Sequence, residues 1–388
     1  MPATPTDRRV AVVIEASNAY ARGLLAGIHR HVRSHEPWTV SLPEHGRGTP
    51  PLEWLAGWHG DGVIARIETA ATARTLDRLR RTRSIPVIDV SAARLLRDLP
   101  YVETDDAAIA RLAADHFFER DFRHFAFLGD DRFRWSLNRC REFVAAVTAR
   151  GREVAVFGGG RRGRATAAGD DEAIAAWLAR LPKPVALLAC YDDRGRQALD
   201  ACRRAGIAVP DEVAVLGVDD DEVLCGLASP PLSSVIPDAV GAGRLAAELL
   251  DRLMRSEPLA GGEWLMPPLG IAVRQSTDVL AIDDALVVAA VRQIRAQACS
   301  GLQVADIART LAVTRRVLER RFTGRVGHTP HEEIRRVQFR RVEQLLLETD
   351  LPLAAIAERA GFAHTEYMTV AFTRRHGMPP SRWRQRRR

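Results

Sequence analysis

The feature that most constrains the fold is a change of pattern near residue 276. From residue 9 to about 275, short apolar runs alternate with amphipathic stretches whose apolar residues recur every three or four positions. From Asp283 onward no strand-like run remains, and every segment has the pattern of a helix. The sequence therefore predicts an α/β domain over residues 1–276 and an all-α domain over residues 277–388.

The first domain has more βα units than one doubly wound lobe requires. We expect strands at residues 9–14, 62–65, 86–90, 124–128, 154–157, 185–189 and 213–218. The helices between them are expected at residues 19–32, 107–119, 137–149, 172–181, 194–204 and 240–255. This pattern favours two lobes built on mainly parallel sheets, with ligand-binding loops at the carboxyl ends of the strands.

The second domain contains a repeated helix-turn-helix pattern. Its expected helices are residues 285–298, 304–311, 315–322, 330–348, 353–360 and 366–376. Two units, at about 304–322 and 353–375, each consist of a short helix, a tight turn and another short helix. The long helix that begins near Pro330 separates them.

The positive charge of the chain is concentrated in this second domain. Residues 283–388 hold 20 arginines and 11 acidic residues, a net charge of +9, whereas residues 1–282 carry a net charge of −2. A basic domain joined to a nearly neutral one indicates that the C-terminal domain binds an anionic polymer.

The end of the chain carries a specific motif. In the second unit, Gly361 permits a left-handed turn residue, and Phe362 fills the gap between the two helices. The motif consists of Ile356, Ala357, Gly361, Phe362, Phe372, Gly377, Pro380, Trp383 and Arg384. With these positions the last hundred residues resemble the DNA-binding domain of the AraC family, and Met368 and Val370 depart from its pattern.

Outward-facing residues of both units are the candidates for contact with a double-stranded DNA operator. Apolar residues four apart face the core, so the polar residues between them face outward. These candidates are Arg315, Arg316, Glu319 and Arg320 in the first unit, and His364, Thr365, Glu366 and Thr369 in the second.

Three segments of the first domain carry a family likeness, at residues 61–65, 121–129 and 207–222. Through them the domain resembles the periplasmic-binding-protein fold that the LacI family uses as a sensor. Joined to an AraC-type domain, this sensor resembles the regulators of xylose operons. The resemblance implies a sugar-responsive activator of pentose (xylose-type) catabolism, a homodimer, contact with RNA polymerase and no cofactor.

Carboxylates and guanidiniums suit a sugar ligand because vicinal hydroxyls both donate and accept hydrogen bonds. Each charged hydrogen bond contributes about 1.5–3 kcal/mol. Asp219 and Asp220 directly follow the strand at 213–218, and Arg139 is a candidate by family likeness. For the aspartates the alternative role is a helix N-cap. The candidate sugar-binding residues are Glu15, Ser17, Asn18, Tyr20, Arg139, Asp192, Asp219 and Asp220.

Two other functions remain as alternatives. Gly158, Gly160 and Gly163 form the spacing of a dinucleotide-binding loop, but helical sequence resumes only near Asp170, so an NAD-dependent enzyme is disfavoured. A secreted sugar-binding protein would need an export signal, and the apolar run at residues 10–14 is too short for one. Five cysteines without a CxxC pair predict neither disulfides nor a metal site. We expect a cytoplasmic protein that does not bind a membrane.

Overall fold

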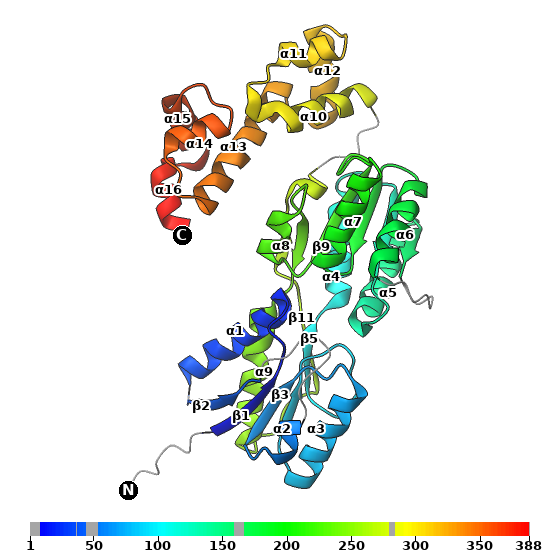
Figure 1. The fold of residues 1–388 in the computed structure, drawn as a ribbon, viewed down its shortest axis with the longest axis vertical. Helices are drawn as coiled ribbons and strands as arrows, with labels where there is room; N and C mark the ends of the chain where they lie inside the picture. The colour runs from blue at the N-terminus through cyan, green and yellow to red at the C-terminus, as the bar shows by residue number, and fades with distance from the viewer. Residues whose placement is uncertain (1–7, 36, 44–52, 159–166, 279–283, 388) are drawn as a thin grey trace. The chain divides into compact units, whose positions relative to one another are not determined.

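The chain folds into two compact units. The computed structural model describes residues 8–387, except residues 36, 44–52, 159–166 and 279–283. The units are Met1–Val279, here called the sensor unit, and Leu280–Arg388, here called the helical unit (Figure 1). Gly160 and Gly163 of the glycine-rich motif lie outside the described residues.

The sensor unit contains two six-stranded sheets, one in each lobe. The sheet of the first lobe has the order β11-β5-β4-β3-β1-β2, and all its recorded pairings are parallel. Its strands are β1 (Arg8–Val13), β2 (Trp38–Ser41), β3 (Gly62–Ala65), β4 (Val87–Asp89), β5 (Tyr101–Thr104) and β11 (Glu263–Met266).

The sheet of the second lobe has the order β12-β10-β9-β8-β6-β7, with only β12 antiparallel to its neighbour among the described pairings. Its strands are β6 (His124–Leu128), β7 (Val154–Phe157), β8 (Val185–Ala189), β9 (Val213–Val218), β10 (Ser233–Ile236) and β12 (Gly270–Ala272). The prediction of two lobes with mainly parallel sheets is confirmed.

Helices cover both faces of each sheet because alternate strand residues point to opposite sides. In the first lobe, Val10 and Val12 pack toward α1 (Ala19–Ser34) and α9 (Ala239–Met254). Ala11 and Val13 face the side that is covered by α2 (Glu53–Gly57) and α3 (Ala70–Arg83). The helices of the second lobe are α4 (Asp106–Phe118), α5 (Arg134–Thr148), α6 (Ala167–Arg180), α7 (Asp192–Arg204), α8 (Glu222–Leu227) and the short η1 (Gln275–Thr277).

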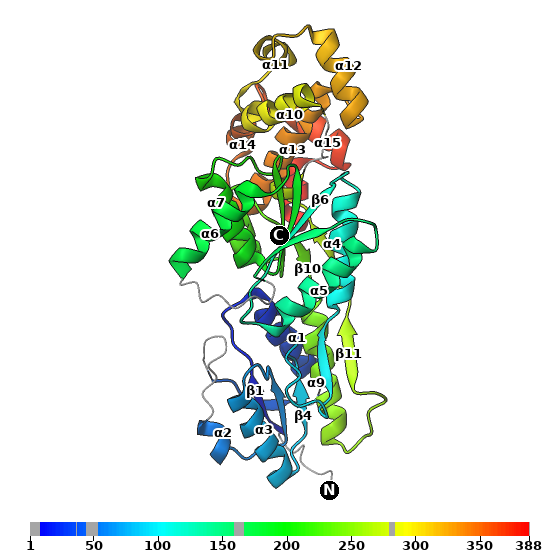
Figure 2. The same cartoon turned by 90° about the vertical axis from the view of Figure 1, so that its right-hand side faces the viewer.

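Helices α1 and α9 lie side by side, although they are far apart in the sequence (Figure 2). Two glycines allow this close approach. A Cβ on Gly27 would lie 2.1 Å from the carbonyl oxygen of Val240, and one on Gly243 would lie 2.1 Å from that of Leu24. Any larger residue at either position would therefore push the helices apart.

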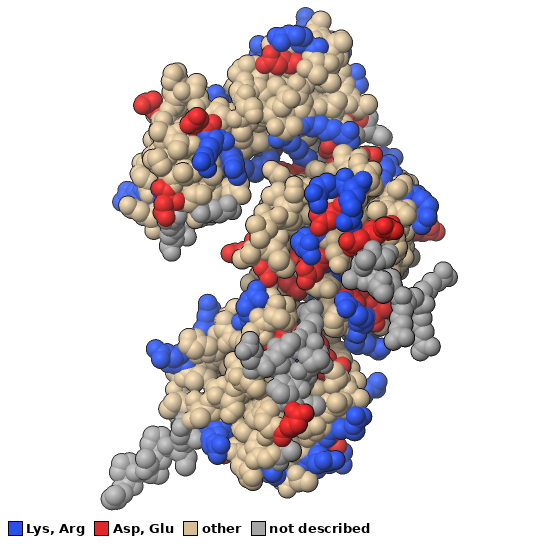
Figure 3. Space-filling view, viewed as in Figure 1, with Lys and Arg blue, Asp and Glu red and all other residues tan. Residues whose placement is uncertain are grey.

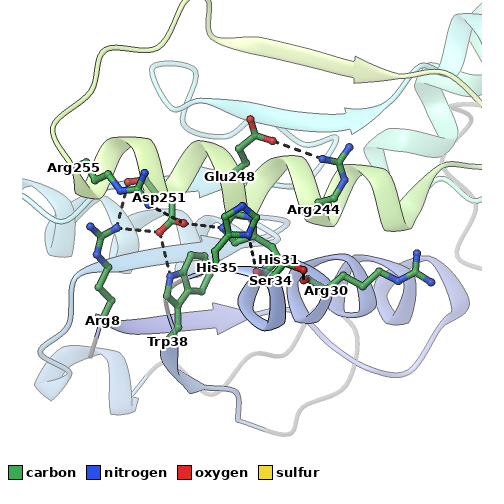
Figure 4. Close-up of polar contacts among 10 residues, drawn as sticks. All are labelled: Arg8, Arg30, His31, Ser34, His35, Trp38, Arg244, Glu248, Asp251 and Arg255. Carbon is green, nitrogen blue, oxygen red and sulfur yellow. Dashed lines mark hydrogen bonds and ion pairs between the residues drawn. The ribbon is translucent and has the colours of Figure 1, made fainter. Parts of the chain in front are cut away.

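Asp251, a buried residue of α9, ties this helix pair to the sheet (Figure 4). Its carboxylate accepts hydrogen bonds from Arg8 Nη1 at 3.0 Å and Trp38 Nε1 at 3.2 Å. His31 Nε2 of α1 lies 2.8 Å from the other oxygen. One side chain thus connects β1, β2, α1 and α9.

The helical unit has two apolar cores connected by one long helix. Its helices are α10 (Ala285–Gln297), η2 (Ala298–Ser300), α11 (Val304–Thr310), α12 (Arg315–Val326), α13 (Pro330–Glu348), α14 (Leu353–Arg359), α15 (Thr365–His376) and α16 (Pro380–Arg387). Leu318 and Phe322 belong to the first core, and Met368 and Phe372 belong to the second. Helix α13 supplies residues to both cores.

Gln338, buried in the middle of α13, holds the two halves of this unit together. Its Nε2 donates to the carbonyl oxygens of Ala298 and Gly361, each at 2.9 Å. Gly361 has a φ of +76°, and a Cβ there would lie 2.7 Å from the backbone of Cys299. The turn of the second helix-turn-helix therefore packs directly against the segment after α10.

We predict that Asp251→Ala destabilises the protein strongly, because it leaves the buried donors of His31 and Trp38 and the partly buried guanidinium of Arg8 without their acceptor. Breaking a buried charge pair costs about 3–5 kcal/mol. Unfolding in urea measures the free energy of unfolding of each variant. Glu248→Ala on the same helix removes an exposed carboxylate and should change stability by no more than about 0.5 kcal/mol. Equal unfolding midpoints for the two variants would contradict the role given to Asp251.

Candidate functional site

A recess in the sensor unit is lined by side chains from both lobes. It opens to solvent, and its cavity volume is about 20 Å³. The first lobe contributes Tyr20, Arg66, Glu103 and Thr104, and the second contributes Trp135, Arg139 and Asp219. Acidic, basic and aromatic groups thus meet in one place.

On the first-lobe side, charged groups are buried and bonded to one another. The Tyr20 hydroxyl donates to Glu103 Oε1 at 2.6 Å. Arg66 forms ion pairs with Glu15 at 2.8 Å and Glu68 at 2.6 Å, while its Nε is buried and has no hydrogen-bond partner among the described residues. Burial raises the pKa of the Glu103 carboxyl above its ordinary value. Arg66 therefore has one donor left for a ligand.

On the second-lobe side, Arg139 is buried and fixed by three contacts. Its Nε donates to Asp106 Oδ1 at 3.0 Å, its Nη1 donates to the carbonyl oxygen of Cys190, and its guanidinium lies 5.5 Å from the centre of the Trp135 ring. Burial alone would lower the pKa of Arg139, but the charges of Asp106 and Asp219 raise it. A fully charged guanidinium is thus held at the recess.

Asp219 lies at the carboxyl end of β9, as the sequence predicts. Its φ is +112°, a backbone conformation that side chains other than glycine rarely adopt. Its backbone N–H donates to the carbonyl oxygen of Val235 at 3.1 Å, which ties this conformation to β10. The strained backbone places the carboxylate in the recess lining.

Three of the eight predicted sugar-binding residues line the recess, namely Tyr20, Arg139 and Asp219. Among the others, Glu15 holds Arg66, and Asn18 caps α1 by accepting from Ala21 N at 2.9 Å. Ser17 is exposed beside this cap. Glu15 and Asn18 therefore hold parts of the lining in place, whereas Ser17 lies next to it.

Asp192 and Asp220 also have structural partners. Asp192 is buried and accepts from Asp221 N at 2.8 Å and from Ser234 Oγ at 2.6 Å. Burial, and then the charge of Asp219, raise the pKa of the Asp192 carboxyl. Asp220 forms an ion pair with Arg274 at 2.8 Å. Both aspartates therefore shape the loop that carries Asp219.

The sequence did not lead to a prediction of Arg66, Glu103 and Thr104 as lining residues. Arg66 directly follows the predicted strand at 62–65, and the same strand-end argument that selected Asp219 applies to it. Glu103 and Thr104 lie at the end of β5, whose sequence Tyr-Val-Glu-Thr has too few apolar residues to mark a strand.

The first helix-turn-helix consists of α11 and α12, and α12 carries the predicted DNA-contacting residues. Arg315 Nε donates to Glu319 Oε1 at 2.8 Å, so these two side chains neutralise each other. Arg316 and Arg320 are exposed, and neither has an ion-pair partner among the described residues. Figure 3 shows basic groups with an adjacent acidic group over α11 and α12.

The second helix-turn-helix consists of α14 and α15. His364 is the N-cap residue of α15 without a side-chain hydrogen bond, and Glu366 is exposed in its first turn. Thr369 is half-buried, and its hydroxyl donates to the carbonyl oxygen of Thr365 at 2.8 Å. On the same helix, Tyr367 is 51% exposed and was not predicted as a DNA contact, and Val370, which departs from the AraC pattern, is 60% exposed. Exposed side chains with apolar surface can contact the methyl groups of thymine bases.

Family models match both units of the chain. A periplasmic binding protein-like domain matches residues 114–277, and a helix-turn-helix domain matches residues 307–386. Within the described residues, no helix has the length and apolar character needed to cross a membrane.

The relatives match either nearly the whole chain or about a fifth of it. The xylose operon regulatory protein of Escherichia coli K12 is 28% identical over 97% of this chain and 96% of its own length. A putative AraC-like transcription regulator of Streptomyces lividans is 39% identical over 21% of this chain and 27% of its own length.

A solved structure has the same fold throughout. The structure of the xylose-binding transcription activator XylR superposes with a TM-score of 0.80 at 27% identity, covering 98% of this chain and 99% of that one. The chain is therefore similar over nearly its whole length to the xylose operon regulatory proteins, and it is a DNA-binding transcription regulator that joins a periplasmic-binding-protein-like domain to an AraC-type helix-turn-helix domain.

Proposed function

We propose that the recess between the lobes binds an aldopentose of the xylose type, and that its binding controls transcription of pentose catabolism genes. The observation that carries this proposal is the recess itself, where Asp219 and Arg139 of one lobe meet Arg66 and Glu103 of the other. Carboxylates accept and guanidiniums donate, which matches adjacent hydroxyls on a sugar ring. The names of the long relatives favour xylose among the sugars.

The aromatic residues of the recess fit the less polar part of a sugar. Tyr20 and Trp135 are both in the lining, and Trp135 is fixed edge-on against Tyr191 at 5.3 Å between ring centres. The free Nε of Arg66 supplies a donor that a ligand hydroxyl would satisfy. We propose Tyr20, Arg66, Glu103, Arg139 and Asp219 as the binding residues, with Glu15, Asn18, Asp192 and Asp220 positioning them.

We propose that the sugar closes the lobes, and that the protein is a cytoplasmic homodimer whose helical unit binds an operator. On α8, Val223 and Leu227 lie four residues apart and are 67% and 78% exposed, which suits a surface covered by a second copy. An activator would also contact RNA polymerase while bound to DNA.

Asp219→Asn should weaken D-xylose binding by about 10- to 100-fold, because a hydrogen bond to a charged group contributes about 1.5–3 kcal/mol. Asparagine keeps the shape and tolerates the positive φ, so the loop should stay intact. Calorimetric titration measures the dissociation constant. Asp193→Asn, on the exposed side of α7, is the matched control and should bind as the wild type does.

If Asp219→Asn binds D-xylose with unchanged affinity, this carboxylate is not a sugar ligand. If the wild-type protein binds neither D-xylose nor any other aldopentose, the proposed effector class is wrong. In both cases the DNA affinity without sugar provides the check that the protein is folded and active.

Arg320→Ala should reduce discrimination between a preferred DNA sequence and a scrambled one. An arginine that donates two hydrogen bonds to a guanine discriminates between bases by about 1–3 kcal/mol. Fluorescence anisotropy with the full chain measures both affinities, using DNA selected from a random library.

Arg325→Ala, near the other end of α12, is the control, because recognition helices contact bases through their first turns. It should preserve the ratio of the two affinities. An equal loss of affinity for both DNAs in Arg320→Ala would show that Arg320 contacts phosphate rather than a base.

A further inference from the structure

A second recess lies beside the first, and arginines dominate its lining. The two recesses share Trp135, and the second has a cavity volume of about 470 Å³. This volume is in the range of small-molecule sites, about 300–1,000 Å³. Four guanidiniums and one carboxylate surround the space, from Arg94, Arg97, Arg132, Arg134 and Glu68.

Three of these five charges already have partners. They form the ion pairs Arg94–Glu263 at 2.7 Å, Arg132–Asp130 at 2.6 Å and Arg66–Glu68 at 2.6 Å. The single carboxylate of the lining is thus neutralised by a guanidinium of the neighbouring recess. The charge that remains in the arginine recess is positive.

The remaining charge comes from Arg97 and Arg134. Both side chains are exposed, and neither forms an ion pair or a hydrogen bond with any of the residues that the structure describes. Arg97 belongs to the segment between β4 and β5 of the first lobe, whereas Arg134 is the first residue of α5 in the second lobe. The two guanidiniums therefore approach the same space from different lobes.

The backbone adds to this positive potential. Helix α5 has 15 residues and begins at the recess, and its N-cap residue Phe133 gives no side-chain hydrogen bond to the first turn. The first N–H groups of a helix carry partial positive charge and bind anions well. A negatively charged group between Arg97 and Arg134 would meet both guanidiniums and this helix end.

We propose that the arginine recess is a second ligand site, which binds the phosphoryl or carboxylate group of a small anionic metabolite. Planar guanidiniums bind both groups through paired hydrogen bonds. Because Arg97 and Arg134 belong to different lobes, the bound anion favours the arrangement in which the lobes lie close together. If the first recess binds a sugar as proposed above, each ligand therefore raises the affinity of the other by the same factor.

Calorimetric titration of the full chain at constant ionic strength tests this site directly. The probes are glucose 6-phosphate for a phosphoryl group, citrate for carboxylates, and glucose as the neutral control. We expect at least one anionic probe to bind and glucose not to compete with it. The double variant Arg97→Gln/Arg134→Gln should weaken that binding by about tenfold or more for each guanidinium lost.

Arg152→Gln, which alters an exposed arginine outside both recesses, is the matched control and should bind the anion as the wild type does. The proposal is overturned if neither anionic probe binds, or if the double variant and Arg152→Gln bind equally well. D-xylose titration of the double variant without anion should give the wild-type affinity. A loss of anion binding with intact xylose binding separates this site from the sugar recess.

Discussion

The sensor depends on two buried guanidiniums, one in each lobe, that carboxylates hold in place. Burying an unpaired charge costs several kcal/mol, so each arginine requires a fixed partner. Arg66 has Glu15 and Glu68, and Arg139 has Asp106. Because these pairs are formed within each lobe, the donors are already oriented without a ligand.

The helical unit uses a different kind of constraint to position its DNA-contacting surface. Gln338 is one buried amide that donates to carbonyl groups from both halves of the unit. The two recognition helices, α12 and α15, are consequently fixed relative to each other through α13. A rigid spacing between them limits the DNA sites that both helices can contact at once, which adds selectivity beyond single base contacts.

Sequence patterns predicted the elements that are buried on both faces, and these predictions are confirmed. The strand at Val185–Ala189 is a continuous apolar run, and the helix at Pro330–Glu348 has a clear apolar period and a proline at its start. The pattern failed for β5 and for α16, which is rich in arginine. Strand β5 is buried inside its sheet, but two of its four residues are polar, and α16 is largely exposed, so neither element has an apolar signature.

The candidate site was predictable only in part. Asp219 and Arg139 were found because strand ends and family likeness mark them, whereas Glu103 depends on β5, which the sequence does not mark. Asp192 follows a strand in the same way as Asp219 does, yet it turns toward Ser234 and Asp221. Local sequence gives the strand end, but only the tertiary contacts decide which carboxylate faces the ligand.

The most direct test of this account is the DNA affinity of the full chain as D-xylose is added. Fluorescence anisotropy with DNA selected from a random library measures this affinity at each sugar concentration. The account predicts that the affinity for DNA changes and saturates at the sugar concentration where calorimetry shows the recess to be half occupied. A DNA affinity that stays constant while the recess fills would contradict the claim that this sensor controls the helical unit.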